Sequence, residues 1–336
     1  MTQPGHARLV RGIYRYPIKG LSPQSVSAIE LEAGKPFPFD RVFALVRPHL
    51  PIDVAAPRWA KKGLFLMLML DGALAQVRTH LAFDSLELTV LRGASVAANG
   101  GSAGECLLSA DLKTSAGRQA VEAFFQAQVP NLNGPPKLVH AGDGHFMDKP
   151  DSVMSCINLA TLRWLEGEWG RPLHPLRFRA NFYIEGVLPW EEFDWIGSDI
   201  QLGDVLFRVD RRNGRCGATN VNPVSGERDM DIPGELRKRF GHKDLGIYLI
   251  ARSSGRVAVG DSVSAPELAS SAAPLAATPL PAPSPNSYIC RGCYLIYDNA
   301  VRPQRFSDLD EAWPCPDCGT NKAQFRPYWS DLAEAR

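Results

Sequence analysis

Two cysteine pairs near the C-terminus constrain the fold of this chain more than any other feature. Cys290 and Cys293 form one CxxC pair, and Cys315 and Cys318 form the other. Four thiolates at this spacing hold one metal ion in a tetrahedral site, either zinc or a single iron. Disulfide pairing is the alternative, and a reducing cytoplasm disfavours it. Because residues 287–327 can build only a small core, we expect the metal to supply much of their folding free energy.

A linker of residues 266–286 separates this metal-binding segment from the rest of the chain. Ala, Pro and Ser dominate it. Proline removes backbone donors and keeps the chain extended, so no packed core is expected here. The sequence therefore predicts a small tethered domain that can move relative to the body.

Charge and hydrophobicity exclude several classes of protein. Lys and Arg total 37 and Asp and Glu total 36, a formal net charge of +1 that gives no support for a nucleic-acid partner. The longest strongly apolar run, Gly63–Leu70, is too short to span a bilayer. The N-terminus lacks the apolar stretch of a signal peptide. We expect a cytoplasmic protein without a membrane partner, and its 336 residues suggest two or three domains.

A separate cysteine, Cys216, lies in the body within the stretch Arg211–Asp229. It follows a predicted strand, Ile200–Asp210, and an Asn213-Gly214 turn signal. Positive charge favours the thiolate, which is both the nucleophile and the soft metal ligand. Three arginines are close in sequence: Arg211, Arg212 and Arg215. A lone cysteine is more often a core residue, but a loop position among arginines favours a functional one.

The stretch around Cys216 resembles the MOSC domain, named for the C-terminal domain of molybdenum cofactor sulfurases. The resembling residues are Arg215-Cys216, Thr219, Asn222-Pro223 and Ser225-Gly226-Glu227. Asn222 replaces a usual aspartate, and Ser225 replaces a common threonine. In this family the matching cysteine either ligates molybdenum or carries sulfur, and the resemblance leaves both roles open for Cys216.

Residues 8–142 are predicted to be β-rich, with one helix over Ala116–Gln128. Two motifs, Tyr16-Pro17-Ile18-Lys19-Gly20 and Phe39-Asp40-Arg41, resemble the β-barrel domain that precedes MOSC, although Gly20 replaces its serine. The resemblance implies that Lys19 and Arg41 bind a cofactor phosphate, as a point charge and as a bidentate partner. A solvated lysine and an ion pair between Arg41 and Asp40 are the simpler alternatives.

Residues 143–265 form the predicted MOSC domain, with an amphipathic helix over Asn158–Trp169. Arg179 and Asn181 enter a strand and have the same parity, so they face one side of an extended chain together. An arginine and an amide on one face suit a phosphate or a pterin edge. A strand that begins with a solvated arginine is the alternative. Tyr248 lies in a Gly-Ile-Tyr sequence that resembles the family's G-x-Y near the metal.

Residues 287–327 resemble rubredoxin in the aromatic residues that flank their cysteines: Tyr288, Tyr297, Trp313 and Phe325. Tyr294 departs from the pattern, because rubredoxin has glycine in this tight turn with positive φ. The stretch between the cysteine pairs is also shorter than in the commonest rubredoxins. The resemblance implies one iron, and a zinc ribbon remains the alternative.

The whole chain resembles the bacterial and mitochondrial amidoxime-reducing proteins, which carry a pterin-dithiolene molybdenum cofactor and reduce N-hydroxylated bases. The implied fold class is mainly β with α (α+β): a MOSC β-barrel, an N-terminal β-barrel domain and a small rubredoxin-like domain. The resemblance further implies that the rubredoxin-like iron delivers electrons, with an N-oxygenated small molecule and an electron-donating reductase as partners. It also carries an expectation of pyridoxal phosphate binding. The residues implied to hold the cofactor are Lys19, Arg41, Arg179, Asn181, Arg215, Cys216 and Tyr248.

Two other classes of function stay open on the sequence. A sulfur carrier or transferase would hold a persulfide on Cys216, with a structural zinc ribbon at the C-terminus. A non-enzymatic binding module would dock a partner through that ribbon.

Overall fold

The computed structural model describes residues 7–50, 52–92, 104–266 and 287–328. The predicted linker therefore lies outside the described residues, except for Pro266. Most regular structure in the described part is β, with three α-helices and several short 3-10 helices, which confirms the predicted fold class. No helix in the described ranges is both long enough and apolar enough to cross a membrane.

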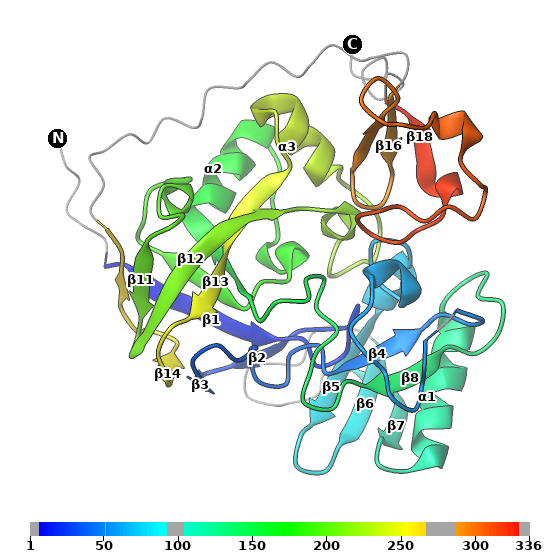
Figure 1. Cartoon of the computed structure of the whole chain (residues 1–336). Helices are drawn as coiled ribbons and strands as arrows, with labels where there is room; N and C mark the ends of the chain where they lie inside the picture. The colour runs from blue at the N-terminus through cyan, green and yellow to red at the C-terminus, as the bar shows by residue number, and fades with distance from the viewer. Residues whose placement is uncertain (1–6, 51, 93–103, 267–286, 329–336) are drawn as a thin grey trace.

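An eight-stranded sheet forms the centre of the body (Figure 1). Neighbouring strands are antiparallel except β9 and β10, which are parallel. Its buried face packs a large apolar core that includes Trp195, Phe182 and Phe207. The strand order is β15 (Val263–Ser264), β11 (Asp199–Leu202), β12 (Val205–Gly214), β13 (Asp244–Ala251), β9 (Met154–Asn158), β10 (Phe182–Glu185), β1 (Leu9–Arg15) and β2 (Gln24–Val26).

The first strands of the chain belong to this central sheet. β1 pairs with β10 and with β2 in this sheet, and β3 (Ala28–Leu31) pairs with β14 (Gly255–Ala258) in a separate two-stranded sheet. Strands from both sides of residue 142 thus pair with one another. Alternating apolar residues predict strands, but they do not say which distant strand is the partner.

The remaining part of the N-terminal segment forms two small sheets around a second apolar core. One pairs β4 (Phe43–Val46) with β8 (Lys137–His140), and the other joins β5 (Val77–Ala82), β6 (Glu87–Arg92) and β7 (Glu105–Asp111). Helix α1 (Ser115–Gln128) begins at Thr114, whose side chain accepts a hydrogen bond from Gly117 N at 3.0 Å. It buries Val121 and Phe125 against this core, as its apolar face predicts.

Two further helices flank the central sheet, α2 (Leu159–Trp169) and α3 (Ile232–Phe240). Asn158 caps α2, and Gly170 ends it with φ 64°. The predicted strand Ile200–Asp210 is in fact a hairpin of β11 and β12 that turns at Gly203-Asp204. The Asn213-Gly214 turn prediction is wrong, because pairing with β13 keeps β12 extended to Gly214.

The C-terminal domain is a three-stranded sheet of β17 (Ile296–Asp298), β16 (Ser287–Cys290) and β18 (Phe325–Pro327). Its small core consists of aromatic rings, in which Phe306 contacts Tyr297 and Trp313. Figure 1 shows this domain, in orange and red, beside α3. It therefore lies against the body in the structure, and the movement predicted from the linker stays a prediction.

Candidate cofactor pocket and metal centre

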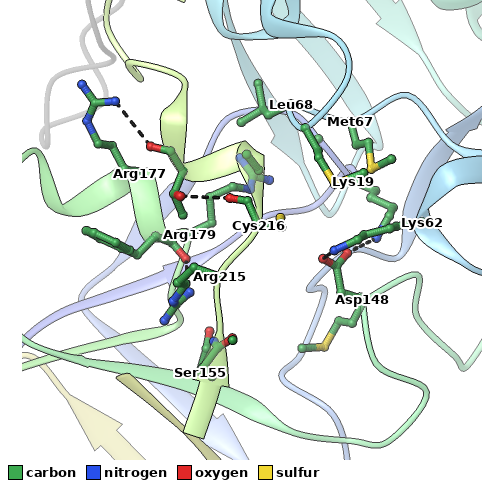
Figure 2. Close-up of a pocket in the computed structure, with 18 of the residues that line it drawn as sticks. Lys19, Lys62, Met67, Leu68, Asp148, Ser155, Arg177, Arg179, Arg215 and Cys216 are labelled. Atoms are coloured by element: carbon green, nitrogen blue, oxygen red, sulfur yellow. Dashed lines mark hydrogen bonds and ion pairs between the residues drawn. The ribbon is translucent and has the colours of Figure 1, made fainter. Parts of the chain in front are cut away.

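Cys216 stands where β12 ends and a short 3-10 helix, Gly217–Asn220, begins. Its carbonyl accepts hydrogen bonds from Thr219 N at 3.0 Å and from Thr219 Oγ1 at 2.9 Å. Both bonds fix the loop through its backbone, so the thiol stays available. The half-buried side chain faces a cavity of about 120 Å³ (Figure 2).

Cationic side chains dominate the lining of this cavity, which we call the Cys216 pocket: Lys19, Arg41, Lys62, Arg177, Arg179 and Arg215. Asp148 is the one carboxylate among its lining residues. Lys19 Nζ lies 2.6 Å and Lys62 Nζ 3.2 Å from its oxygens. Desolvation disfavours the charged form of Asp148, but its side chain is 44% exposed. The two ammonium groups outweigh desolvation and hold the pKa of Asp148 well below its usual range. The pocket therefore keeps an excess of positive charge.

Among the cations of the Cys216 pocket, Arg179 gives the strongest indication of an anionic ligand. Its guanidinium stacks on the ring of Tyr16 at 4.4 Å and donates to the Leu21 carbonyl at 2.7 Å. No carboxylate pairs with it within the described part of the chain. Burial therefore lowers the pKa of Arg179 to about 10.

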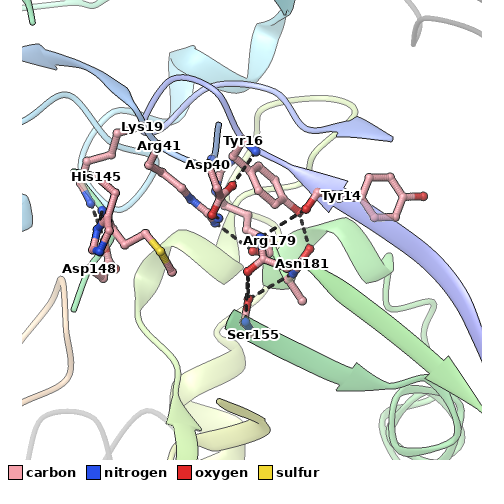
Figure 3. A network of polar contacts seen from close by, with 12 residues as sticks. Tyr14, Tyr16, Lys19, Asp40, Arg41, His145, Asp148, Ser155, Arg179 and Asn181 are labelled. Atoms are coloured by element: carbon pink, nitrogen blue, oxygen red, sulfur yellow. Dashed lines mark hydrogen bonds and ion pairs between the residues drawn. The ribbon is translucent and has the colours of Figure 1, made fainter. Parts of the chain in front are cut away.

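Arg41 also lies over the Tyr16 ring, with its guanidinium 4.2 Å from the ring centroid (Figure 3). It pairs with Asp40 and donates to the Arg179 carbonyl at 3.0 Å. Both arginines have left-handed backbones, with φ 52° at Arg41 and φ 51° at Arg179. Each such residue costs on the order of 1–3 kcal/mol, a strain that concentrates at functional sites.

Arg215 and Tyr248 also line the pocket, but Arg215 is already used by the fold. Its Nε donates to the Leu245 carbonyl at 2.6 Å, and its NH1 donates to the Phe178 carbonyl at 3.1 Å. Arg211 and Arg212 do not line the pocket. Arg211 pairs with Asp151 at 2.6 Å, and the Arg212 guanidinium lies over the Phe193 ring. The predicted arginine cluster therefore contributes one member.

Asn181 is fully buried and is not among the residues that line the Cys216 pocket. Its Oδ1 accepts a hydrogen bond from Ser155 N at 3.0 Å, and its Nδ2 donates to the Tyr14 carbonyl at 3.2 Å. The 3-10 turn at Pro175–Phe178 and the left-handed Arg179 break the extended chain on which the shared parity of Arg179 and Asn181 depended. Asn181 therefore holds Ser155, which does line the pocket.

A second cavity, of about 760 Å³, adjoins the Cys216 pocket. Both cavities are lined by Gly20, Leu68, Arg177, Arg179 and Ala218. Ligand pockets typically measure about 300–1,000 Å³, so the larger cavity adds the room that an organic ligand needs.

The four cysteines of the C-terminal domain form one buried cluster, with all four sulfurs within 4.8 Å of one another. The Sγ atoms of Cys290 and Cys318 are 3.8 Å apart, and those of Cys293 and Cys315 are 3.6 Å apart. A tetrahedral metal with bonds of about 2.3 Å places its sulfurs about 3.8 Å apart. The cluster fits one zinc or one iron, and all four cysteines are free of disulfides in this structure.

The cysteine cluster packs directly against the Cys216 pocket. Met67 and Met69 join all four metal-site cysteines in one apolar cluster, and Cys216 packs against it. Gly217 N, next to Cys216, donates to the Gly292 carbonyl, next to Cys293, at 2.7 Å. A metal in the cluster would therefore be a close neighbour of any group that Cys216 holds.

Several pocket residues escaped prediction: Lys62, Met67, Asp148, Ser155 and Arg177. Arg177 could have been found, because it precedes Arg179 in the segment that resembles MOSC. Lys62 and Asp148 lie in connecting segments outside any motif, so only the folded chain brings them to Cys216.

A family model of the MOSC domain matches residues 139–264. A molybdenum cofactor sulfurase of Anopheles gambiae is 26% identical over 272 residues, which are 70% of this chain and 33% of that protein. The chain thus spans about a third of the sulfurase's length. A YuaD protein of Bacillus subtilis, a solved structure, has a TM-score of 0.36 at 13% identity and covers 79% of this chain and 98% of its own.

The C-terminal segment has a relative of its own. A probable rubredoxin of Methanothermobacter thermautotrophicus is 42% identical over 48 residues, which are 12% of this chain and 76% of that protein. The match agrees with the four-cysteine cluster and the aromatic core around it. The chain is therefore a MOSC-domain protein with a rubredoxin-like domain at its C-terminus.

Proposed function

We propose that the protein is a molybdenum-cofactor-dependent oxidoreductase that reduces N-oxygenated small molecules. The observation that carries this proposal is a half-buried thiol in a cationic pocket, directly beside a four-cysteine metal site. Arg179, a half-buried arginine without a carboxylate partner in the described chain, fits the anionic phosphate of a pterin cofactor. When bound, the cofactor supplies a redox-active metal at which oxygen can leave nitrogen.

The residues of this chain would hold the cofactor and leave one side open. Cys216 offers a thiolate, the soft ligand that a metal of this kind takes. Arg179 and Arg41, which both stack on Tyr16, would present guanidinium groups to the phosphate and pterin, and Lys19 would add a point charge. Arg215 is held by carbonyls and so fixes the loop rather than gripping the ligand.

Reduction of an N-hydroxylated base takes two electrons and two protons and releases the base and water. The rubredoxin-like domain would deliver these electrons one at a time from a single iron, and a separate reductase would reload it. Its position against Met67 and Met69 supports this role.

Metal analysis with a visible spectrum tests the proposal. We expect stoichiometric molybdenum and pterin in the body, and the red colour of a ferric thiolate in the C-terminal domain. A colourless protein with bound zinc would instead favour a structural ribbon.

The similarity to a molybdenum cofactor sulfurase favours a second candidate, a sulfur carrier with a persulfide on Cys216. This candidate predicts labile sulfur on Cys216 and no molybdenum. Pyridoxal phosphate has less support, because it needs a free lysine and both pocket lysines, Lys19 and Lys62, pair with Asp148.

A further inference from the structure

Tyr294 is the residue of the C-terminal domain that a rubredoxin would not be expected to carry. Its φ is 61°, a left-handed backbone that favours glycine, and its side chain is buried. A tyrosine keeps such a conformation only where its surroundings hold it there. The contacts of this side chain show where those surroundings are.

The Tyr294 side chain leaves its own domain and contacts the body. Its hydroxyl accepts a hydrogen bond from Asn220 Nδ2 at 3.0 Å and donates to Asp231 Oδ1. Asn220 ends the short helix that Cys216 begins, and Asp231 caps α3. One tyrosine hydroxyl thus connects the C-terminal domain both to α3 and to residues 216–220, which we call the Cys216 loop.

The backbone around both cysteine pairs is also bonded to the body. Beside the first pair, the Gly292 carbonyl accepts from Gly217 N at 2.7 Å, and the Tyr294 carbonyl accepts from Arg237 NH2 at 2.8 Å. Beside the second, the Cys318 carbonyl accepts from Gly63 N at 2.7 Å. These donors come from three separate segments of the body, so the contact is not one loop resting on another.

The two surfaces approach so closely that the body requires glycine at Gly63. A Cβ added there would lie 2.7 Å from the Cys318 carbonyl oxygen, whereas a Cβ added to Gly292 would meet the flexible end of the Met69 side chain, 2.6 Å away at Cε. Gly63 has no positive φ, so close approach, not backbone conformation, excludes a side chain there.

We propose that the body carries a dedicated docking site for the rubredoxin-like domain, built from Gly63, the Cys216 loop and the start of α3, and that Tyr294 is its docking residue. This inference goes beyond the proposed function, because it does not depend on which metal or substrate the protein uses. In the docked position, the backbones beside Cys293 and Cys216 are also linked directly. The link is a single hydrogen bond, from Gly217 N to the Gly292 carbonyl.

Amide hydrogen exchange of the full-length protein tests the docking site, with metal content measured on the same samples. Tyr294→Gly relieves the left-handed backbone but removes the hydroxyl. We expect it to keep its full metal content while exchange of the segment around Gly217 accelerates about tenfold or more, because two hydrogen bonds across the interface are lost. Tyr297→Phe is the matched control: its hydroxyl donates to Gln304 within the domain, so exchange at Gly217 should not change.

Gly63→Ala changes the docking site on the body and leaves the rubredoxin-like domain unchanged. We expect the same accelerated exchange around Gly217 with full metal content, and no change for Gly167→Ala, where a Cβ meets nothing within 4 Å. Wild-type exchange at Gly217 in Tyr294→Gly or in Gly63→Ala would overturn the proposal. Loss of the metal in Tyr294→Gly would also overturn it, because Tyr294 would then serve the metal site instead of the interface.

Discussion

Cys216 is held by its backbone, which makes its side chain a good target for substitution. Thr219 binds its carbonyl twice, and the thiol contributes no bond to the described fold. We therefore expect Cys216→Ser to fold normally and to lose turnover of an N-hydroxylated substrate, with a changed molybdenum spectrum. Circular dichroism and an unfolding midpoint provide the control for folding. Turnover at the wild-type rate would contradict the role of Cys216 as a ligand.

Alanine substitution of Arg179 or Lys19 should weaken cofactor binding, to different extents. Charge-assisted contacts to phosphate contribute about 1.5–3 kcal/mol each, so each alanine variant should lower cofactor affinity about ten- to a hundredfold. We expect Arg179→Ala to have the larger effect, because Lys19 divides its charge between a ligand and Asp148. Molybdenum and pterin contents of the purified variants measure this.

A matched control for these variants is Arg163→Ala, which removes an exposed arginine that pairs with Glu185 at 2.8 Å. Its cofactor content should equal that of the wild type. Full molybdenum and pterin in both Arg179→Ala and Lys19→Ala would remove these residues from the phosphate site.

Residues that lie within motifs could be predicted, whereas residues brought in by the fold could not. Lys19, Arg41, Arg179 and Cys216 stand in recognisable sequence patterns and converge on one cavity. Asn181 stands in such a pattern too, but its polar atoms bind Ser155 and backbone. Local sequence does not show whether a polar group faces a cavity or another polar group.

At the scale of elements, Glu192 joins α2 to the loop that follows β10. Its carboxylate accepts hydrogen bonds from Asn158 Nδ2 at 2.8 Å and from Thr161 Oγ1 at 3.1 Å. Burial outweighs these bonds and raises the pKa of Glu192 to about 7. In the unfolded chain the same group titrates near its ordinary pKa of about 4.5.

This raised pKa predicts a stability that falls with rising pH. Between about pH 4.5 and 7 the folded state keeps the proton on Glu192 and the unfolded state loses it, so the free energy of unfolding falls by about 3 kcal/mol. Glu192→Gln should remove this part of the pH dependence. Urea unfolding of both proteins at several pH values measures the difference. Parallel curves would show that Glu192 is already ionised in the fold.

The elements themselves were predictable where the pattern was long and periodic. The ranges of α1 and α2 agree with the apolar spacing in the sequence. β12 extends through Asn213 and Gly214 because β13 pairs beside it. A turn signal describes local preference, and pairing with a neighbouring strand can override it.

At the scale of the whole molecule, the rubredoxin-like domain should control the supply of electrons to the pocket. Replacing both Cys315 and Cys318 by serine removes half of the metal ligands. We expect the red colour to disappear and turnover with the physiological reductase to stop. An artificial dye that reaches the pocket directly should still support turnover.

Truncation after Ala265 should reproduce this result, and adding the isolated domain in trans should restore activity only at high concentration, because the linker no longer raises its local concentration. Rapid-mixing spectroscopy gives the decisive comparison. The iron must reoxidise at least as fast as substrate is consumed. Iron that stays reduced during turnover would place it outside the electron pathway.

The pairing of β1 with β10 has a consequence for how the protein is made on the ribosome. Arg8, beside β1, bonds to Glu191 across 183 residues of sequence, so the central sheet cannot close until most of the body has been synthesised. The rubredoxin-like domain follows the body in the chain and emerges later still. During translation there is thus an interval in which the Cys216 loop has formed and its docking partner does not yet exist. All residues that line the Cys216 pocket, from Lys19 to Tyr248, precede the rubredoxin-like domain in the chain, so the pocket can form before that domain docks.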